Sequence, residues 1–433
     1  MRWRSAAGLI AWPLAAVIAG ACRAPRGGPE IGTQQYGRTV ARNPDGCIDR
    51  FDPDADYFPD KVRIDSASQV SLEYHGHYKV MTVTFRGFTD NPKWTSVERY
   101  VLVQCGTPAP ALHGALAGAQ LITIPAKTVT VTNNEDLGMM IALGLRDQIK
   151  SVGTRAIYDE ALWRKLQAGN LMVTFGWGTS EIHVEWMLDL KPDVVVVGAF
   201  QSQAALNMDR ARAVGLQTVP SLTRVEPTPL GRAEWIKALA AVFNLESRAN
   251  RLYDDVAAEY RRLAREAHAA STRPTAFWAS TYASGEWLAS RNTFQARLLE
   301  DAGAENALAY NGPTITMRVG PEVILDRAGD ADFWITENSD LVRPDGSVSV
   351  SGTPVEALSA ARANHVFHLA RRYRRENNSA DYYQTAPYRP DLVLADLIAI
   401  FHPELVSHHE FSFLAPMPSL RRMQTAADAG TRR

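Results

Sequence analysis

The sequence has 433 residues, of which 46% are hydrophobic, and it carries 46 basic against 47 acidic side chains. This near-zero net charge excludes a strongly basic nucleic-acid-binding protein. A chain of this length can bury more than one hydrophobic core, so we expect two or three domains.

The first 21 residues have the pattern of a cleaved export signal. A basic start precedes an apolar run of about fifteen residues, which is too short for a membrane span. Small residues stand directly before Cys22, as in the cleavage box of bacterial lipoproteins. We therefore predict that Cys22 is lipidated and that residues 22–45 form a tether. The alternative is an ordinary signal peptide cut near Ala21 or Ala24. Removing residues 1–21 leaves 44 basic and 47 acidic side chains, a net charge of −3.

The three cysteines support export. An odd number of cysteines in an exported chain needs an explanation. A lipid on Cys22 leaves Cys47 and Cys105 as one candidate disulfide in an oxidising compartment. We therefore expect neither a catalytic cysteine nor a cysteine-rich metal site.

Residues 46–118 are predicted to form a β-rich N-terminal extension. Leu72–Phe85 and Glu98–Cys105 alternate between apolar and polar side chains, and turn-forming residues separate them. We expect a β-hairpin that the Cys47–Cys105 disulfide holds in place.

Residues 119–228 alternate short apolar strands with short helices, which is typical of a doubly wound parallel sheet. The clearest strand is the four-valine run Val194–Val197, which opens at a Pro-Asp turn and has no polar face. We predict an N-terminal α/β lobe here.

The longest periodic segment follows at residues 229–270. Apolar side chains recur at three- and four-residue steps from Trp235 to Leu263. A helix from Gly231 to His268 would be about 57 Å long. Two core helices joined near Asn244 are the alternative, and we favour a mainly continuous helix. Residues 271–410 are predicted to form a second α/β lobe, followed by a tail at 411–433.

Two motifs carry a family resemblance. A glutamate that opens a short amphipathic helix before a buried strand occurs twice, at Glu185 and at Glu322. The run Arg389–Leu405 reads RPD-LVL-ADL-IAIF-HPE-L and ends the second lobe. Between Leu121 and Leu405 the chain resembles the periplasmic substrate-binding proteins of ABC importers for iron-siderophores, haem and cobalamin.

The resemblance implies a fold and a function. The fold would be α/β, with two Rossmann-like lobes joined by a long α-helix. The protein would act, as a monomer without a cofactor, in the periplasm or at the cell surface. It would bind a ferric siderophore between its lobes and deliver it to the permease, with Glu185 and Glu322 as the docking residues. Haem or cobalamin is the alternative ligand.

The residues themselves favour binding over catalysis. The sequence has no Gly-x-Ser-x-Gly elbow, phosphate loop or His-Glu-x-x-His zinc helix, and we expect no metal site. An enzyme acting on such a ligand is the weaker alternative. Ligands of open α/β sheets bind beyond the carboxyl ends of the strands, where aromatic and arginine side chains suit a flat anionic chelate. The candidates are Trp177, Phe200, Arg224, Tyr282, Trp287, Arg318 and Arg372.

Overall fold

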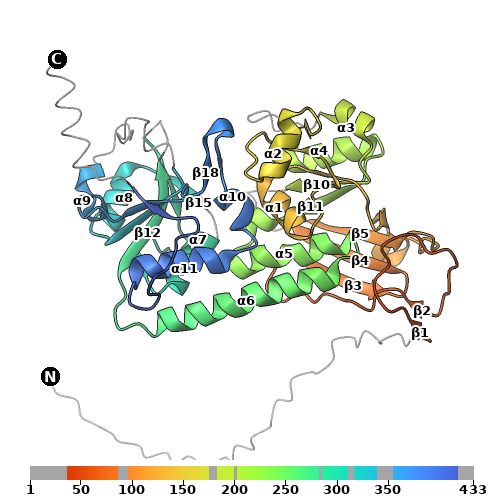
Figure 1. Ribbon diagram of the computed structural model, residues 1–433, viewed down its shortest axis with the longest axis horizontal. Helices are drawn as coiled ribbons and strands as arrows, with labels where there is room; N and C mark the ends of the chain where they lie inside the picture. The colour runs from red at the N-terminus through yellow and green to blue at the C-terminus, as the bar shows by residue number, and fades with distance from the viewer. Residues whose placement is uncertain are drawn as a thin grey trace, which may run out of the picture. The chain divides into compact units, whose positions relative to one another are not determined.

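The N-terminal lobe is built on a parallel sheet of five strands in the order β11-β10-β7-β8-β9 (Figure 1). The computed structural model describes residues 37–85, 96–174, 183–198, 202–281, 285–310, 316–338 and 355–417. The strands of this sheet are β7 Val129–Val131, β8 Ile149–Val152, β9 Met172–Val173, β10 Val194–Gly198 and β11 Thr218–Ser221. Its helices are α1 Asn134–Ala142, α2 Glu160–Gln167, α3 Val184–Leu190 and α4 Ser202–Ala213. The valines of β10 are fully buried, as expected for a central parallel strand.

The C-terminal lobe has a seven-stranded sheet in which parallel and antiparallel pairs are mixed. Its order is β15-β13-β12-β16-β17-β20, and β14 also pairs with β12. The strands are β12 Thr275–Thr281, β13 Trp287–Ser290, β14 Glu305–Asn306, β15 Thr316–Val319, β16 Phe333–Thr336, β17 Val366–His368 and β20 Ala415–Pro416. Its helices are α7 Phe294–Asp301, α8 Pro321–Ala328, α9 Ser359–Arg362, α10 Tyr382–Thr385 and α11 Pro390–Phe401.

Two helices, rather than one continuous helix, span residues 229–268. α5 spans Pro229–Ala241 and α6 spans Glu246–His268. The preference for a continuous helix is therefore wrong, because Asn244 adopts a left-handed backbone with φ 56° and reverses the chain. α6 is about 35 Å long at 1.5 Å per residue.

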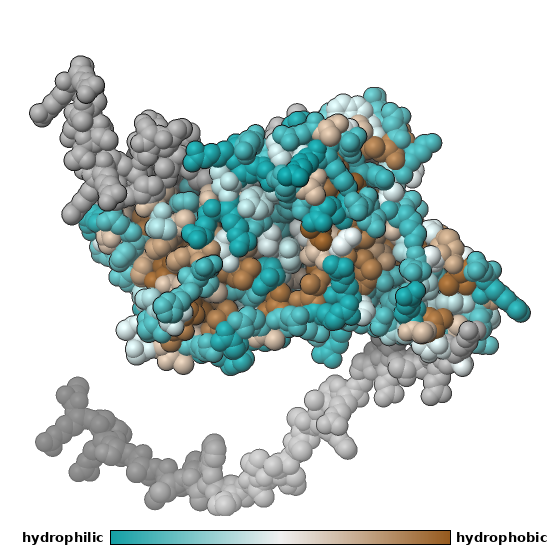
Figure 2. All heavy atoms as spheres, viewed as in Figure 1, coloured by the Kyte–Doolittle hydropathy of each residue, from teal (hydrophilic) through white to brown (hydrophobic). Residues whose placement is uncertain are grey.

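The second of these helices connects the two hydrophobic cores. Ala249, Tyr253 and Ala257 of α6 pack in the core of the N-terminal lobe, whereas Tyr260 and Leu263 pack in that of the C-terminal lobe. In Figure 1 α6 runs beneath both sheets. Apolar side chains gather around α5 and α11 on the same face in Figure 2. α6 is therefore the interlobe helix. No helix among the described residues is long and apolar enough to cross a membrane.

The N-terminal extension is larger than a hairpin. It is a four-stranded sheet of β3 Val70–His75, β4 Tyr78–Phe85, β5 Ser96–Gln104 and β6 Gln120–Ile124. β6 pairs in parallel with β5, so the predicted boundary at residue 119 falls before a strand that belongs to the extension. The Cys47–Cys105 disulfide is present, with 4.4 Å between the Cα atoms.

The described parts of the predicted tether and of the predicted tail contain strands and buried residues. The tether prediction is wrong for its last residues, since β1 Arg38–Thr39 pairs with β2 Ala55–Asp56 and Asn43 is buried. The tail prediction is wrong for residues 411–417. Phe413 and Leu414 are buried in the core of the C-terminal lobe, and Asp396 accepts hydrogen bonds from their backbone amides.

Candidate functional site

The order of the N-terminal sheet creates a binding position at its carboxyl edge. The chain passes from β7 to β8 on one side and from β10 to β11 on the other, so β7 and β10 flank a topological switch point. Ligands of open α/β sheets bind outside the strand ends at such points. Glu135 opens α1 directly after β7, and Arg224 lies in the short 3₁₀ helix Thr223–Val225 after β11. Their side chains form an ion pair of 3.3 Å at this edge.

Asp136 fixes the base of this edge. Its carboxylate is fully buried and accepts hydrogen bonds from Ser221 Oγ at 2.7 Å and Thr223 Oγ1 at 3.1 Å. Asn133 caps the helix by accepting from the Asp136 backbone amide. Burial raises the pKa of Asp136 to about 6 despite these donors, and the neighbouring Glu135 adds to the shift. The side chain therefore ties the start of α1 to the end of β11.

Arg232 of α5 reaches from the N-terminal lobe to the C-terminal lobe. Its guanidinium carbon lies 3.7 Å from the ring centroid of Phe294 in α7, a cation–π contact, and its Nε donates to the Thr223 carbonyl at 3.0 Å. Burial lowers the pKa of Arg232 from its usual range, and Glu135 opposes this shift. Arg232 therefore connects the carboxyl edge of the N-terminal sheet to the C-terminal lobe.

The C-terminal lobe contributes a matching edge. Glu337 follows β16 and accepts from Gln295 Nε2 at 3.1 Å and from Tyr383 Oη at 3.4 Å. Burial and the Glu337 carboxylate raise the pKa of Tyr383, which keeps its hydroxyl protonated as a donor. Glu337 thus holds α7 and α10 at the end of the second sheet.

These two edges enclose one cavity between the lobes. It is lined by Glu135, Arg224, Pro229, Arg232, Phe294, Gln295, Leu298, Glu337, Tyr382, Tyr383, Ala386, Pro387, Pro390 and Val393. The lining combines aromatic rings with two arginines and two carboxylates, which suits a ligand with flat surfaces and polar substituents. Within the described ranges no three His, Cys, Asp or Glu side chains are grouped as metal ligands. The cavity has a volume of about 50 Å³, which is smaller than the roughly 300–1,000 Å³ typical of small-molecule pockets.

Comparison with known families decides the class of protein. A family model described as periplasmic binding protein matches residues 129–373, which is more than half of the chain. The chain belongs to the periplasmic binding protein family. The family is described as one of binding proteins, which confirms the expectation of a binding protein rather than an enzyme.

Individual relatives are distant. The binding protein is 22% identical over 319 residues to an uncharacterized lipoprotein of Methanocaldococcus jannaschii, covering 71% of this chain and 73% of that one. Its fold is similar to a periplasmic binding protein from Veillonella parvula, with a TM-score of 0.53 and 14% identity, covering 76% of this chain and 99% of that one. A periplasmic haem-binding protein from Pseudomonas aeruginosa gives a TM-score of 0.50 and 17% identity, covering 68% of this chain and 98% of that one. These two likenesses show the two-lobe fold alone.

The predicted ligand-binding residues have different surroundings. Arg224 lines the interlobe cavity of the binding protein. The prediction for Trp287 is wrong, because its side chain is fully buried against Trp334 and offers no surface to a ligand. Arg318 lies on β15 with an ion pair to Glu286. Trp287 and Arg318 lie on the paired strands β13 and β15, and neither lines the cavity with Arg224.

Four further residues are predicted to bind the ligand. Arg372 pairs with Asp381 at 3.2 Å, outside the cavity lining. Trp177, Phe200 and Tyr282 lie outside the described residues. They stay predictions.

Sequence reasoning missed most of the cavity lining. Glu135 and Glu337 each stand within a few residues of a predicted strand end, so the strand-end rule alone could have found them. Arg232 and Phe294 lie on helices, and no sequence pattern indicates that they face each other.

The predicted docking residues lie on the surface. Glu185 and Glu322 are both exposed in the first turns of α3 and α8. Cys22 lies outside the described residues.

Proposed function

We propose that this binding protein is the extracytoplasmic receptor of an ABC importer and that it binds a ferric siderophore between its lobes. The observation that carries the proposal is the interlobe cavity, where Arg224 and Arg232 stand beside Phe294 and Tyr383. Arginines pair with anionic groups and aromatic rings pack against flat organic chelators. Arg224 is half exposed and so has surface to offer a ligand.

Haem is the second candidate ligand, with cobalamin after it. A haem-binding protein from Pseudomonas aeruginosa has a similar fold, and a cavity lined by several aromatic rings also suits a porphyrin. An enzyme acting on such ligands has no support in the family match.

Fluorescence titration distinguishes these ligands. The purified chain would be titrated with a ferric catecholate, a ferric hydroxamate, haem and cobalamin while its tryptophan emission is followed. We expect a dissociation constant below about 10 µM, near −7 kcal/mol, for one ferric chelate. Arg224→Gln should weaken that binding, whereas Arg318→Gln, outside the cavity, should not. Failure of all four ligands to bind would contradict the proposal.

We further propose that α3 and α8 dock onto the permease. Besides Glu185 and Glu322, each helix carries an exposed aspartate four residues later, Asp189 in α3 and Asp326 in α8. Residues four apart lie on one helix face, so each lobe presents a pair of carboxylates. Paired carboxylates on both lobes would fix the orientation of the protein on a basic partner.

Charge reversal tests the docking surface. The double variant Glu185→Arg and Glu322→Arg should keep ligand affinity and abolish transport, because like charges would then meet. The matched control is Glu73→Arg with Glu305→Arg, which makes the same charge change at exposed positions outside α3 and α8. Normal transport by the docking variant would overturn the assignment.

The proposed location follows from two observations. The family works outside the cytoplasm, and a Methanocaldococcus jannaschii relative is described as a lipoprotein. We propose that a lipid on Cys22 anchors the chain to the membrane surface.

A further inference from the structure

A short segment of the C-terminal lobe reaches across to the N-terminal lobe. It comprises residues 373–385 and is named the clasp here. It contains β18 Tyr373–Arg374, the 3₁₀ helix Arg375–Asn377, β19 Ser379–Ala380 and α10. Tyr382 anchors the clasp to the C-terminal lobe, because its buried ring lies near Trp278 and Phe413. In Figure 1 β18 and α10 lie beside α1 and α2.

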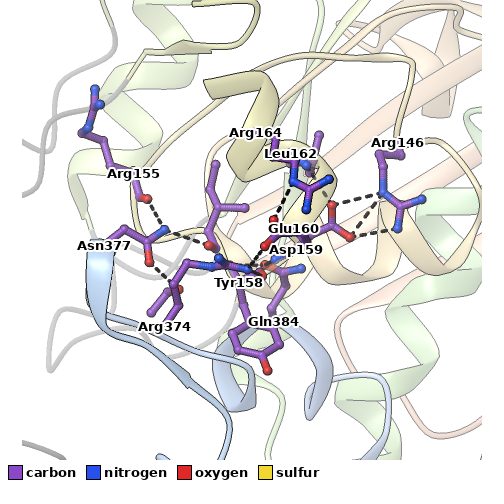
Figure 3. Close-up of polar contacts among 12 residues, drawn as sticks. Arg146, Arg155, Tyr158, Asp159, Glu160, Leu162, Arg164, Arg374, Asn377 and Gln384 are labelled. Carbon is purple, nitrogen blue, oxygen red and sulfur yellow. Dashed lines mark hydrogen bonds and ion pairs between the residues drawn. The ribbon is translucent and has the colours of Figure 1, made fainter. Parts of the chain in front are cut away.

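The tip of the clasp binds the loop between β8 and α2. Asn377 Nδ2 donates to the backbone carbonyls of Arg155 at 3.0 Å and Ile157 at 2.8 Å (Figure 3). Ser379 Oγ donates to Asn377 Oδ1 at 2.8 Å and so orients the amide for both contacts. This loop follows the carboxyl end of β8, at the same edge of the sheet as the cavity.

Two more side chains extend the same contact. Gln384 Oε1 accepts from the backbone amides of Tyr158 at 3.0 Å and Asp159 at 3.3 Å. Arg374 Nη2 donates to the Tyr158 carbonyl at 3.0 Å and to Glu160 Oε2 at 2.6 Å. Backbone groups of the loop are thus satisfied by side chains of the other lobe, which a buried or half-buried loop requires.

The backbones of the two lobes also approach closely at Gly138. A Cβ atom added at this position of α1 would lie 1.6 Å from the Gln384 carbonyl oxygen. Only glycine allows α10 to sit this close to α1. The clasp is therefore seated against the N-terminal lobe by shape as well as by hydrogen bonds.

Successive residues of α10 contact three different parts of the protein. Tyr382 enters the core of the C-terminal lobe, Tyr383 binds Glu337 at the cavity, and Gln384 binds the N-terminal lobe. A movement of one lobe relative to the other must therefore move a wall of the cavity.

We propose that the clasp is a tie that, together with α6, sets the separation of the lobes and the width of the interlobe cavity. A connecting helix alone allows the lobes to bend and twist about it, and each further attachment, such as the Arg232–Phe294 contact or the clasp, restricts that freedom. The tie rests on contacts between described residues, and only its consequence for ligand capture rests on the proposed function. Release of the clasp widens the cavity.

Distance measurement between spin labels tests the tie on ligand-free protein. The labels would be attached to the substitutions Gln167→Cys, exposed at the end of α2, and Ala363→Cys, exposed after α9. The labelled protein would be the full chain with Cys22→Ala. The triple variant Arg374→Ala, Asn377→Ala and Gln384→Ala should shift the distances to longer values and broaden them.

The control variant removes a contact that the Glu160 carboxylate makes within the N-terminal lobe. Arg164 also binds Glu160, at 2.7 Å, but both residues belong to α2. Arg164→Ala should leave the distances unchanged. An unchanged distribution in the triple variant would overturn the proposal, whichever ligand the cavity binds.

A second variant covers the case in which the triple variant does not fold. Gly138→Ala keeps every polar group of the clasp and displaces α10 by its added methyl group alone. It should lengthen the same distances, with circular dichroism confirming that the fold is kept. If neither Gly138→Ala nor Asn377→Ala alone changes the distances, the clasp is not a tie.

Discussion

Lys79 and Glu246 form an ion pair in which neither side chain has any solvent-exposed surface. Lys79 Nζ also donates to Asn244 Oδ1 at 2.7 Å and to the Ala241 carbonyl at 2.8 Å. Burial lowers the pKa of Lys79, and Glu246 opposes that shift. Lys79 therefore ties β4 of the extension to the turn where α5 ends and α6 begins.

Removing Lys79 should destabilise the whole protein. Lys79→Met would leave Glu246 buried without its charged partner, which costs about 3–5 kcal/mol of unfolding free energy. Urea unfolding followed by circular dichroism measures the loss. Lys61→Met is the matched control, because the Lys61–Asp56 pair is partly exposed and should cost at most about 1 kcal/mol. Equal effects of both variants would contradict the importance of the buried pair.

Asp136 should make stability depend on pH. Its folded pKa of about 6 lies above the ordinary value of 3.8, so the folded state holds the proton more tightly. This stabilisation is fully present below pH 3.8 and is lost as the pH rises through about 6. The loss is roughly 3 kcal/mol.

The Asp136→Asn variant isolates this effect, since it keeps acceptors for Ser221 and Thr223 but cannot ionise. Its unfolding free energy relative to the parent should rise by roughly 3 kcal/mol over that pH range. A difference that does not change with pH would show that Asp136 is not the titrating group.

The disulfide should contribute measurably to stability. Cys47 and Cys105 are 58 residues apart in sequence, and a cross-link of that loop length restricts the unfolded chain by about 4 kcal/mol. Cys47→Ser with Cys105→Ser should lower the unfolding free energy by a similar amount in urea titrations. Mass mapping without reduction should find the two cysteines joined in the parent protein, and free thiols there would contradict the prediction.

Membrane association should depend on Cys22. Cys22→Ala would remove the thiol that we propose carries the lipid, so the protein should move from the membrane fraction to the soluble extracytoplasmic fraction. Its circular dichroism spectrum and ligand affinity should match those of the lipid-free parent domain. Membrane association that persists in this variant would contradict lipidation.

Local sequence pattern predicted the regular elements well. The valine run appears as β10, and the C-terminal motif appears as α11 at 390–401. The chain reversal was not predicted as the favoured outcome, because apolar residues continue through it at Val242 and Phe243. Asparagine tolerates the left-handed backbone that reverses the chain, and periodicity does not report backbone angles.

The cavity and the clasp were harder to predict. Arg232 and Phe294 meet only through the packing of two lobes, and their sequence separation leaves no periodic signal. Asn377 binds backbone carbonyls more than 200 residues away. Every residue has a backbone carbonyl, so the sequence alone does not indicate which carbonyls a side chain binds.

Gly320 offers a test of docking that changes no charge. The Glu322 carboxylate folds back over this residue, so that a Cβ added at position 320 would lie 2.2 Å from Oε1 and 2.3 Å from Oε2. The backbone there is extended, with φ −73° and ψ 162°, which alanine adopts readily. Gly320→Ala should therefore displace the carboxylate and leave the fold intact, changing the unfolding free energy by at most about 1 kcal/mol.

If Glu322 pairs with the permease, this displacement should reduce transport while ligand affinity stays the same. Transport would be measured as uptake of the radiolabelled chelate by cells that carry each variant. Gly46→Ala is the matched control, because a Cβ at that position meets nothing within 4 Å. Equal uptake by Gly320→Ala and Gly46→Ala cells would show that the position of the Glu322 carboxylate does not matter for docking.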